Sequence, residues 1–270
     1  MSDQTQPVSS SPIHRVVVAL DASPYSRAVL RTAARIAVGL GAQLEGLFVE
    51  DARLLDVAEL SIAAELRQPG GMRAYDRTLA ERELRVVAQT VERWAGEIAR
   101  PHNPEWRFRV VRGNIAQSVM EAAGANALLS LGRYSKPIGM RPTRIGSVTQ
   151  QVWGAYSAPL LLLHKEIRPG QPILLTTSGG ADELPLVAMA VRLSQLYKSP
   201  LIVLAEGGPA EIFLRAALAD NAEPVTFRRL RPGTLAEQIL AIISQDQVGA
   251  VLSHRRDSSL AEMECAVILL

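Results

Sequence analysis

Short aliphatic runs alternate with longer amphipathic stretches along most of the chain. The runs Val16–Leu20 and Ala127–Leu131 are almost wholly apolar, as strands are when helices cover both faces of a sheet. The stretch from Pro24 to about Gly41 has apolar residues at helical spacing, and Ser23 before Pro24 offers an N-cap followed by proline at the first helical position. This alternation predicts an α/β fold with a parallel sheet and helices on both faces.

The same reasoning places the other elements of the first part of the chain. It predicts strands over Leu44–Val49, Trp106–Val111 and Pro159–Leu163, and helices over Arg73–Arg100, Ile115–Ala123 and Gly146–Tyr156. The longest of these helices has an apolar stripe at spacings of three and four residues, formed by Leu84, Val87, Val91, Trp94 and Ile98. Such a stripe is typical of a helix that packs on a sheet.

After a charged Pro/Gly segment the pattern starts again, which indicates an internal repeat. The copy has predicted strands over Ile173–Thr177, Leu201–Ala205, Val225–Phe227, Gly249–Leu252 and Ala266–Leu270, and helices over Leu184–Tyr197 and Leu235–Ser244. Only a dozen residues separate Ser253 from Ala266, whereas 27 separate Leu131 from Pro159. We therefore expect a disordered tail (1–12), a complete domain (13–165), a linker (166–171) and a trimmed domain (172–270) whose corresponding pocket is lost.

A basic loop follows the run that ends at Leu131. It extends from Gly132 to Ile145 and contains Arg133, Lys136, Arg141 and Arg144, and no acidic residue occurs between Glu121 and Glu166. A strand, a flexible loop and a helix start form the geometry in which backbone N–H groups bind phosphate. This loop is the best functional indication in the sequence.

Composition limits the remaining possibilities. The chain has 270 residues, 48% hydrophobic and 4% aromatic residues and a net charge of +2, so a nucleic-acid partner for the whole protein is not indicated. The only cysteine, Cys265, excludes an intramolecular disulfide, suits a reducing cytoplasm and is expected to be buried and inert. The four histidines lack metal-ligand spacing, and we expect neither a signal peptide nor a membrane span.

Four segments resemble the universal stress protein family: Val16–Ser23, Leu47–Asp51, Val111–Gly113 and Leu131–Thr149. The resemblance implies two tandem doubly wound domains of the adenine nucleotide alpha hydrolase type. It also implies ATP or a related adenine nucleotide as ligand, and a regulatory or protective role in stress without turnover. The final strands Pro159–Leu163 and Ala266–Leu270 would lie at the contact between the domains, and a homodimer stays open.

The ATP-binding members of that family carry a phosphate loop written G-x2-G-x9-G-[S/T]. Here Gly132, Gly146 and Ser147 match its ends, but a serine stands at the second glycine and the spacer has ten residues. Asp21 and Ala19 fall where the family contacts adenosine, and Val49 falls at an adenine contact. The implied site residues are Ala19, Asp21, Val49, Leu131, Gly132, Ser135, Gly146, Ser147 and Val148.

Other interpretations of these residues stay open. Asp21 could stabilise the helix that starts near Pro24, and Ser147 could be an ordinary helix cap. The chain could also be an interaction module of the same family that has lost its nucleotide. Finally, Ser178–Asp182 is similar to the SGGxDS loop of ATP pyrophosphatases, although Glu183 replaces the last serine; the alternative is a glycine turn in which Asp182 caps the next helix.

Overall fold

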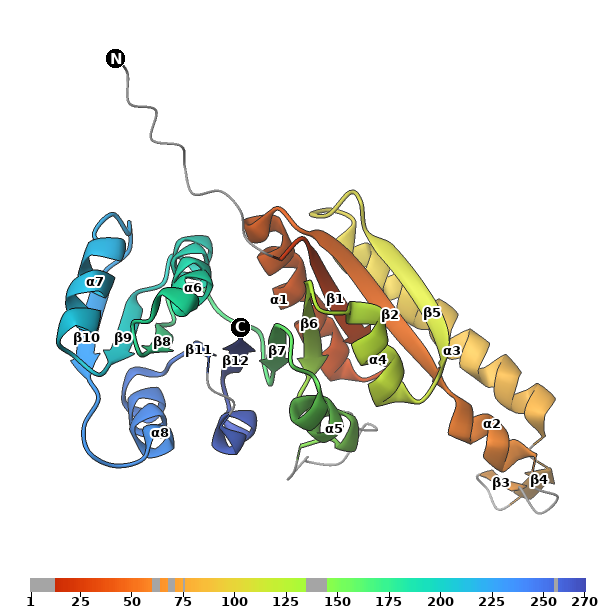
Figure 1. The fold of residues 1–270 in the computed structure, drawn as a ribbon. Coiled ribbons are helices and arrows are strands. Elements are labelled where there is room, and N and C mark those ends of the chain that lie inside the picture. The colour runs from red at the N-terminus through yellow and green to blue at the C-terminus, as the bar shows by residue number, and fades with distance from the viewer. Residues whose placement is uncertain (1–12, 60–63, 68–70, 75, 135–144, 255–256) are drawn as a thin grey trace.

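The computed structural model describes residues 13–59, 64–67, 71–74, 76–134, 145–254 and 257–270. The predicted tail (1–12) and most of the basic loop, including Ser135, lie outside these residues. The described part of the chain forms one long twisted sheet with helices on both faces, and a small hairpin projects at one end (Figure 1). We call residues 13–164 the N-terminal half and residues 165–270 the C-terminal half.

The N-terminal half contains seven strands and five helices within its described residues. The strands are β1 (Arg15–Leu20), β2 (Gln43–Asp51), β3 (Ala64–Arg67), β4 (Gly71–Ala74), β5 (Arg107–Gly113), β6 (Ala127–Gly132) and β7 (Leu160–Leu163). The helices are α1 (Pro24–Leu40), α2 (Ala52–Ala58), α3 (Arg77–Ala99), α4 (Ile115–Ala123) and α5 (Ser147–Ala155).

The C-terminal half repeats this alternation with shorter elements. Its strands are β8 (Ile173–Thr177), β9 (Leu201–Ala205), β10 (Val225–Arg229), β11 (Ala250–Ser253) and β12 (Ala266–Leu269). Its helices are α6 (Leu184–Tyr197), α7 (Pro209–Ala217) and α8 (Leu235–Asp246), with short 3₁₀ helices η1 (Ala181–Glu183) and η2 (Ser258–Glu262). The single turn η2 stands where the N-terminal half has α5.

The strand order shows that the halves share one topology. The N-terminal half has the order β5-β2-β1-β6-β7, and the C-terminal half has the equivalent order β10-β9-β8-β11-β12. Within each half the neighbouring strands of this long sheet are parallel, which confirms the predicted doubly wound α/β class. The halves meet through β7 and β12, which pair antiparallel with Leu161 opposite Ile268.

Two hydrophobic layers cover the sheet. One lies under α1, α3, α6 and α7, and the other lies under α4, α5, α8 and η2. Alternate residues of each strand enter opposite layers, so that Leu161 lies in the first layer and Leu162 in the second. This arrangement explains why the strands are aliphatic at almost every position.

The predicted start of the long helix at Arg73 is wrong. Arg73 lies in β4, and α3 begins at Arg77 because the Asp76 carboxylate caps it by accepting a hydrogen bond from the Leu79 amide at 2.8 Å. The predicted stripe still meets the core, since Val91 and Trp94 are buried. The elements α2, β3, β4 and α7 were not predicted.

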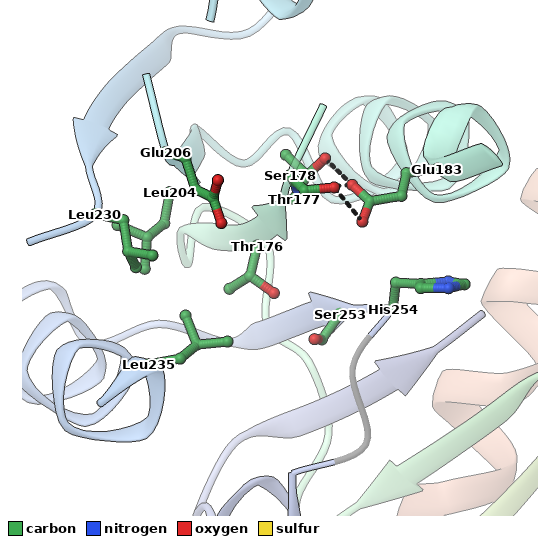
Figure 2. Close-up of a pocket in the computed structure, with 10 residues that line it drawn as sticks. All are labelled: Thr176, Thr177, Ser178, Glu183, Leu204, Glu206, Leu230, Leu235, Ser253 and His254. Atoms are coloured by element: carbon green, nitrogen blue, oxygen red, sulfur yellow. Dashed lines mark hydrogen bonds between the residues drawn. The ribbon is translucent and has the colours of Figure 1, made fainter. Parts of the chain in front are cut away.

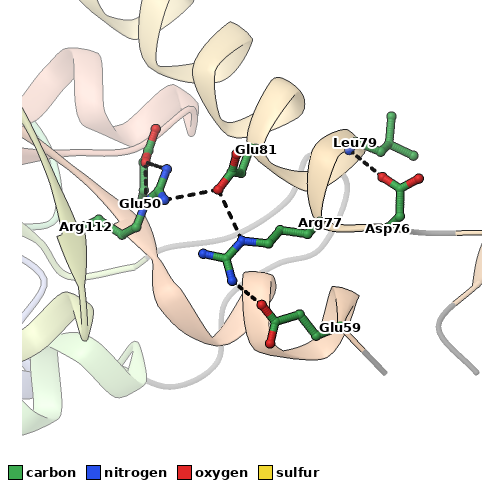
Figure 3. Close-up of polar contacts among 7 residues, drawn as sticks. All are labelled: Glu50, Glu59, Asp76, Arg77, Leu79, Glu81 and Arg112. Atoms are coloured by element: carbon green, nitrogen blue, oxygen red, sulfur yellow. Dashed lines mark hydrogen bonds and ion pairs between the residues drawn. The ribbon is translucent and has the colours of Figure 1, made fainter. Parts of the chain in front are cut away.

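A chain of alternating charges fixes α2 and α3 to the edge of the sheet (Figure 3). Arg112 of β5 binds Glu50 of β2 at 2.9 Å and Glu81 of α3 at 3.2 Å. Arg77 continues the chain from Glu81 to Glu59 at the end of α2. The projecting segment between β2 and α3 is therefore held by ion pairs in addition to its small apolar cluster around Leu55.

Candidate functional site

A pocket opens at the carboxyl ends of β1, β2 and β6 in the N-terminal half. It encloses about 620 Å³, part of it open to solvent, and the first turns of α4 and α5 complete its walls. Its lining residues are Ala19, Leu20, Asp21, Ser26, Leu47, Phe48, Val49, Ile115, Val119, Leu131, Gly132, Tyr134, Val148 and Thr149. Ligands of parallel α/β sheets bind at this edge.

The structure brings together most of the residues that the sequence singled out. Ala19, Asp21, Val49, Leu131, Gly132 and Val148 all line the pocket. Gly146 and Ser147 lie directly before Val148, as the N-cap and the first residue of α5. Leu47 and Thr149 also line the pocket but were not predicted, although the first lies two residues before Val49 on a strand and the second ends the Gly-Ser-Val-Thr segment.

Asp21 is held at the mouth of the pocket by the start of α1. Its Oδ1 accepts hydrogen bonds from the Ser23 amide at 2.9 Å and from the Ser26 hydroxyl at 2.5 Å. The Ser26 hydroxyl in turn accepts one from the Asp21 amide. These contacts orient the carboxylate, and they equally stabilise the first turn of α1, so both predicted roles agree with the geometry. The predicted cap Ser23 occupies the N-cap position without a side-chain hydrogen bond.

Hydrogen bonds fix α5 to the end of β6. The Gly146 amide donates to the Arg133 carbonyl at 3.1 Å, and the Thr149 hydroxyl donates to the Gly132 carbonyl at 3.0 Å. The cap is Gly146 rather than the predicted Ser147, and its position has no side-chain hydrogen bond. The amides and the positive dipole end of α5 therefore stay close to the pocket wall at Val148.

A second pocket, much smaller than the first, lies at the corresponding edge of the C-terminal half, so the cavity that was expected to be lost is strongly reduced (Figure 2). Strand pairing defines the equivalence: Val16 of β1 and Ile173 of β8 face the same layer and occupy the same register positions against their neighbours. On this basis Ala19 corresponds to Thr176, Val49 to Glu206, Leu131 to Ser253 and Gly132 to His254. At these four positions polar side chains replace apolar ones and a glycine, and the second pocket is much smaller than the first.

Glu183 occupies the turn beside this second pocket. Its carboxylate accepts hydrogen bonds from the Thr177 and Ser178 hydroxyls and from the amides of Ser178 and Gly179. Burial alone would raise the pKa of Glu183, but these hydrogen bonds outweigh it and hold the pKa below its ordinary value of 4.5. The predicted role of Asp182 is wrong, because the N-cap position of α6 is Glu183.

The remaining predictions concern the single cysteine, a metal site and a membrane span. Cys265 is a buried free cysteine, and burial raises the pKa of its thiol to about 11. No group of three His, Cys, Asp or Glu side chains that could hold a metal ion occurs among the described residues. None of the described helices is both long and apolar enough to cross a membrane.

The universal stress protein family matches residues 12–164, which include the pocket of the N-terminal half, and the chain belongs to this family. A universal stress protein from Archaeoglobus fulgidus DSM 4304 superposes with a TM-score of 0.65 at 14% identity, over 95% of this chain and 97% of that protein. A functionally unknown protein from Pseudomonas aeruginosa PAO1 gives 0.57 at 14% identity, over 96% and 93%. At these identities the likeness concerns the fold alone. No curated protein matches the sequence.

Proposed function

We propose that this protein is a regulatory or protective stress-response module that binds ATP or a related adenine nucleotide in its N-terminal half. The observation that carries the proposal is the pocket where Ala19, Asp21, Val49 and Gly132 meet the first turn of α5. The bound nucleotide would bias the conformation or the partner choice of the protein in the cytoplasm, without turnover. The C-terminal half, in this proposal, is a trimmed copy of the same domain.

The shape and lining of the pocket suit a nucleoside. The cavity is partly open to solvent, so a ligand can enter it. The aliphatic side chains of Leu47, Val49 and Val119 offer apolar surface for a flat base. Asp21 and Thr149 supply polar groups for the ribose at the other end, and they are rigid because both are hydrogen-bonded to neighbouring elements.

The start of α5 suits the phosphates. A helix N-terminus presents unsatisfied amides and about half a positive charge, and Gly146 lets an anion approach the backbone closely. The sequence also supplies Arg133, Lys136, Arg141 and Arg144 between β6 and α5 without an acidic residue. These features support an anionic ligand at this end of the pocket.

The first experiment asks what the purified protein releases on denaturation, by absorbance and mass spectrometry. We expect an adenine nucleotide, and an affinity for added ATP that falls at least about tenfold in Val49→Glu. This substitution copies Glu206 of the second pocket and places a carboxylate against the base. Val86→Glu on α3 is the matched control, because Val86 is exposed and no residue of α3 lines the pocket. Absence of nucleotide and of ATP binding would instead favour the interaction module that has lost its ligand.

A pyrophosphatase-type enzyme is the weakest alternative. In such an enzyme the amides after Ser178 would hold phosphate, but here the Glu183 carboxylate already accepts from Ser178 and Gly179. Release of pyrophosphate from ATP that depends on Ser178 would be needed to support this alternative.

A further inference from the structure

Arg133 is the largest side chain that is almost completely buried in the described structure, with 1% exposure. It follows the last residue of β6 and points toward the seam, which we define as β7, β12 and η2. Its Nη2 donates to the Leu260 carbonyl of η2 at 3.4 Å, across 127 residues of sequence. Its Nε and Nη1 atoms are buried and have no hydrogen-bond partner among the described residues.

This arrangement costs stability. A buried guanidinium loses its hydration, and only good partners for its N–H groups compensate for that loss. Burial accordingly lowers the pKa of Arg133, although a side-chain hydrogen bond with Tyr134 and the charges of Tyr134, Cys265 and Glu264 oppose the shift. An apolar side chain of similar length would fill the same space without the cost. A position that breaks the rules of a well-packed interior in this way points to a role other than stability.

The backbone of Arg133 joins the same seam to the nucleotide pocket. Its amide donates to the Leu163 carbonyl at 2.8 Å, and its carbonyl accepts from the Gly146 amide at 3.1 Å. The next residue, Tyr134, lines the pocket and packs edge-on against His164, with ring centroids 5.3 Å apart. A shift of Arg133 would therefore move both Tyr134 and the first turn of α5.

We infer that Arg133 is a positioning residue through which η2 of the C-terminal half sets the geometry of the nucleotide pocket. Its side chain is fixed to η2 and its main chain holds Gly146, so the trimmed half supports the phosphate end of the site. The inference rests on the proposed function. In this inference the C-terminal half supports the pocket of the N-terminal half and needs no ligand of its own to do so.

The test compares Arg133→Met with the wild-type protein in three measurements. We expect an equal or higher melting temperature, an ATP affinity at least about tenfold weaker, and faster amide exchange over Ser147–Gln150 at the start of α5. A purely structural role would lower the melting temperature together with the affinity. Arg133→Lys keeps the charge and should recover part of the affinity.

Arg228→Met is the matched control, because Arg228 forms its ion pair with Asp246 in the C-terminal half at 2.8 Å, far along the sheet from the pocket. It should change neither ATP affinity nor exchange at α5. The inference is overturned if Arg133→Met binds ATP within twofold of wild type with unchanged exchange, or if this variant is unstable. If the wild-type protein binds no ATP, the proposed function fails, and the exchange measurement alone still decides the role of Arg133.

Discussion

Buried charged side chains show how single residues shape this molecule. Glu45 of β2 is 9% exposed and is paired with Arg15 at 3.3 Å and with Arg109 at 2.8 Å. Glu183 is 5% exposed and is satisfied by hydroxyls and amides of its own turn. Arg133 is buried, and its Nε and Nη1 atoms have no hydrogen-bond partner among the residues that the structure describes. The first two cases follow the rule that buried charges find partners, and the third is the exception that suggests function.

Glu183→Gln tests the internal carboxylate of the second pocket. The amides of Ser178 and Gly179 would lose an ionic acceptor, so we expect the free energy of unfolding at pH 7 to fall by about 1–3 kcal/mol. Chemical denaturation measures this change. Glu92→Gln is the control, since Glu92 is exposed on α3 and should change stability by no more than about 0.5 kcal/mol.

The lowered pKa of Glu183 predicts that its contribution to the free energy of unfolding depends on pH. The pKa of Glu183 is lowered on folding, so the unfolded chain binds this proton more tightly than the folded protein. The stabilisation by Glu183 is therefore complete above its unfolded pKa of 4.5 and is lost as the pH falls through the lower folded value. The difference between the wild-type protein and Glu183→Gln should shrink in that acid range, and a difference that grows there would contradict the assignment.

Gly46 shows a close approach between a strand and a side chain. A Cβ built at this position would lie 2.3 Å from the Trp106 ring, so β2 has room here only for glycine. We expect Gly46→Ala to lower the free energy of unfolding by about 1–3 kcal/mol through overpacking. Gly154, with open space around its position in α5, is the control: Gly154→Ala should not destabilise. Equal effects of the two substitutions would rule out the steric explanation.

At the scale of elements, the sequence predicted those that combine a strong period with clear end signals. The helices over 115–123 and 184–197 and the strands over 173–177 and 201–205 are confirmed at both ends. The excursion between β2 and α3 was not predicted, because α2 has seven residues and the paired strands β3 and β4 have four each. Segments this short are fixed by contacts with the rest of the fold, which a local pattern does not contain.

For the candidate site too, residues in periodic elements were predicted and residues outside them were not. Residues at strand ends, such as Asp21 and Val49, were predicted because the order of strands brings their ends to one edge. Tyr134 was missed because it lies beyond the strand, where no periodicity operates. The shared strand registers leave a small hollow at the corresponding edge of the C-terminal half, where η2 replaces α5.

Arg77→Gln tests how the excursion is attached. It removes the ion pair of Arg77 with Glu59 at the end of α2 and the pair with Glu81 within α3, so we expect faster amide exchange throughout α2 than in the wild-type protein. The difference should diminish at about 1 M salt, because the ion pairs are exposed and screened there. Arg85→Gln on the exposed face of α3 should leave α2 unchanged. An identical response in both variants would mean that the charge chain does not hold α2.

At the scale of the whole molecule, the antiparallel pair β7–β12 joins five strands from each half into one ten-stranded sheet. Leu161 and Ile268 are both 0% exposed and lie opposite each other at the centre of that pair. Helices α1 and α6 pack across the same junction on one face (Figure 1). The two halves therefore share a core as well as a strand pair, and we expect them to unfold together.

The tryptophans allow this cooperativity to be measured. All three, Trp94, Trp106 and Trp153, belong to the N-terminal half, whereas circular dichroism reports helices of both halves. Denaturation followed by the two signals should give coincident transitions, as a two-state process requires. Leu161→Ala should shift both transitions equally, by a destabilisation of about 2–5 kcal/mol. Separate midpoints would show that the halves are independent units.

The central claim is our proposal that only the N-terminal half binds a nucleotide. Its pocket is lined mainly by apolar residues and lies against helix α5. The second pocket is smaller, has more polar residues in its lining, and adjoins the hydrogen-bonded carboxylate of Glu183. Calorimetric titration of the nucleotide-free protein with ATP tests this claim most directly. We expect saturation at one ATP per chain in the wild-type protein and an affinity at least about tenfold weaker in Val49→Glu. Saturation at two per chain, or binding that Val49→Glu leaves intact, would contradict it.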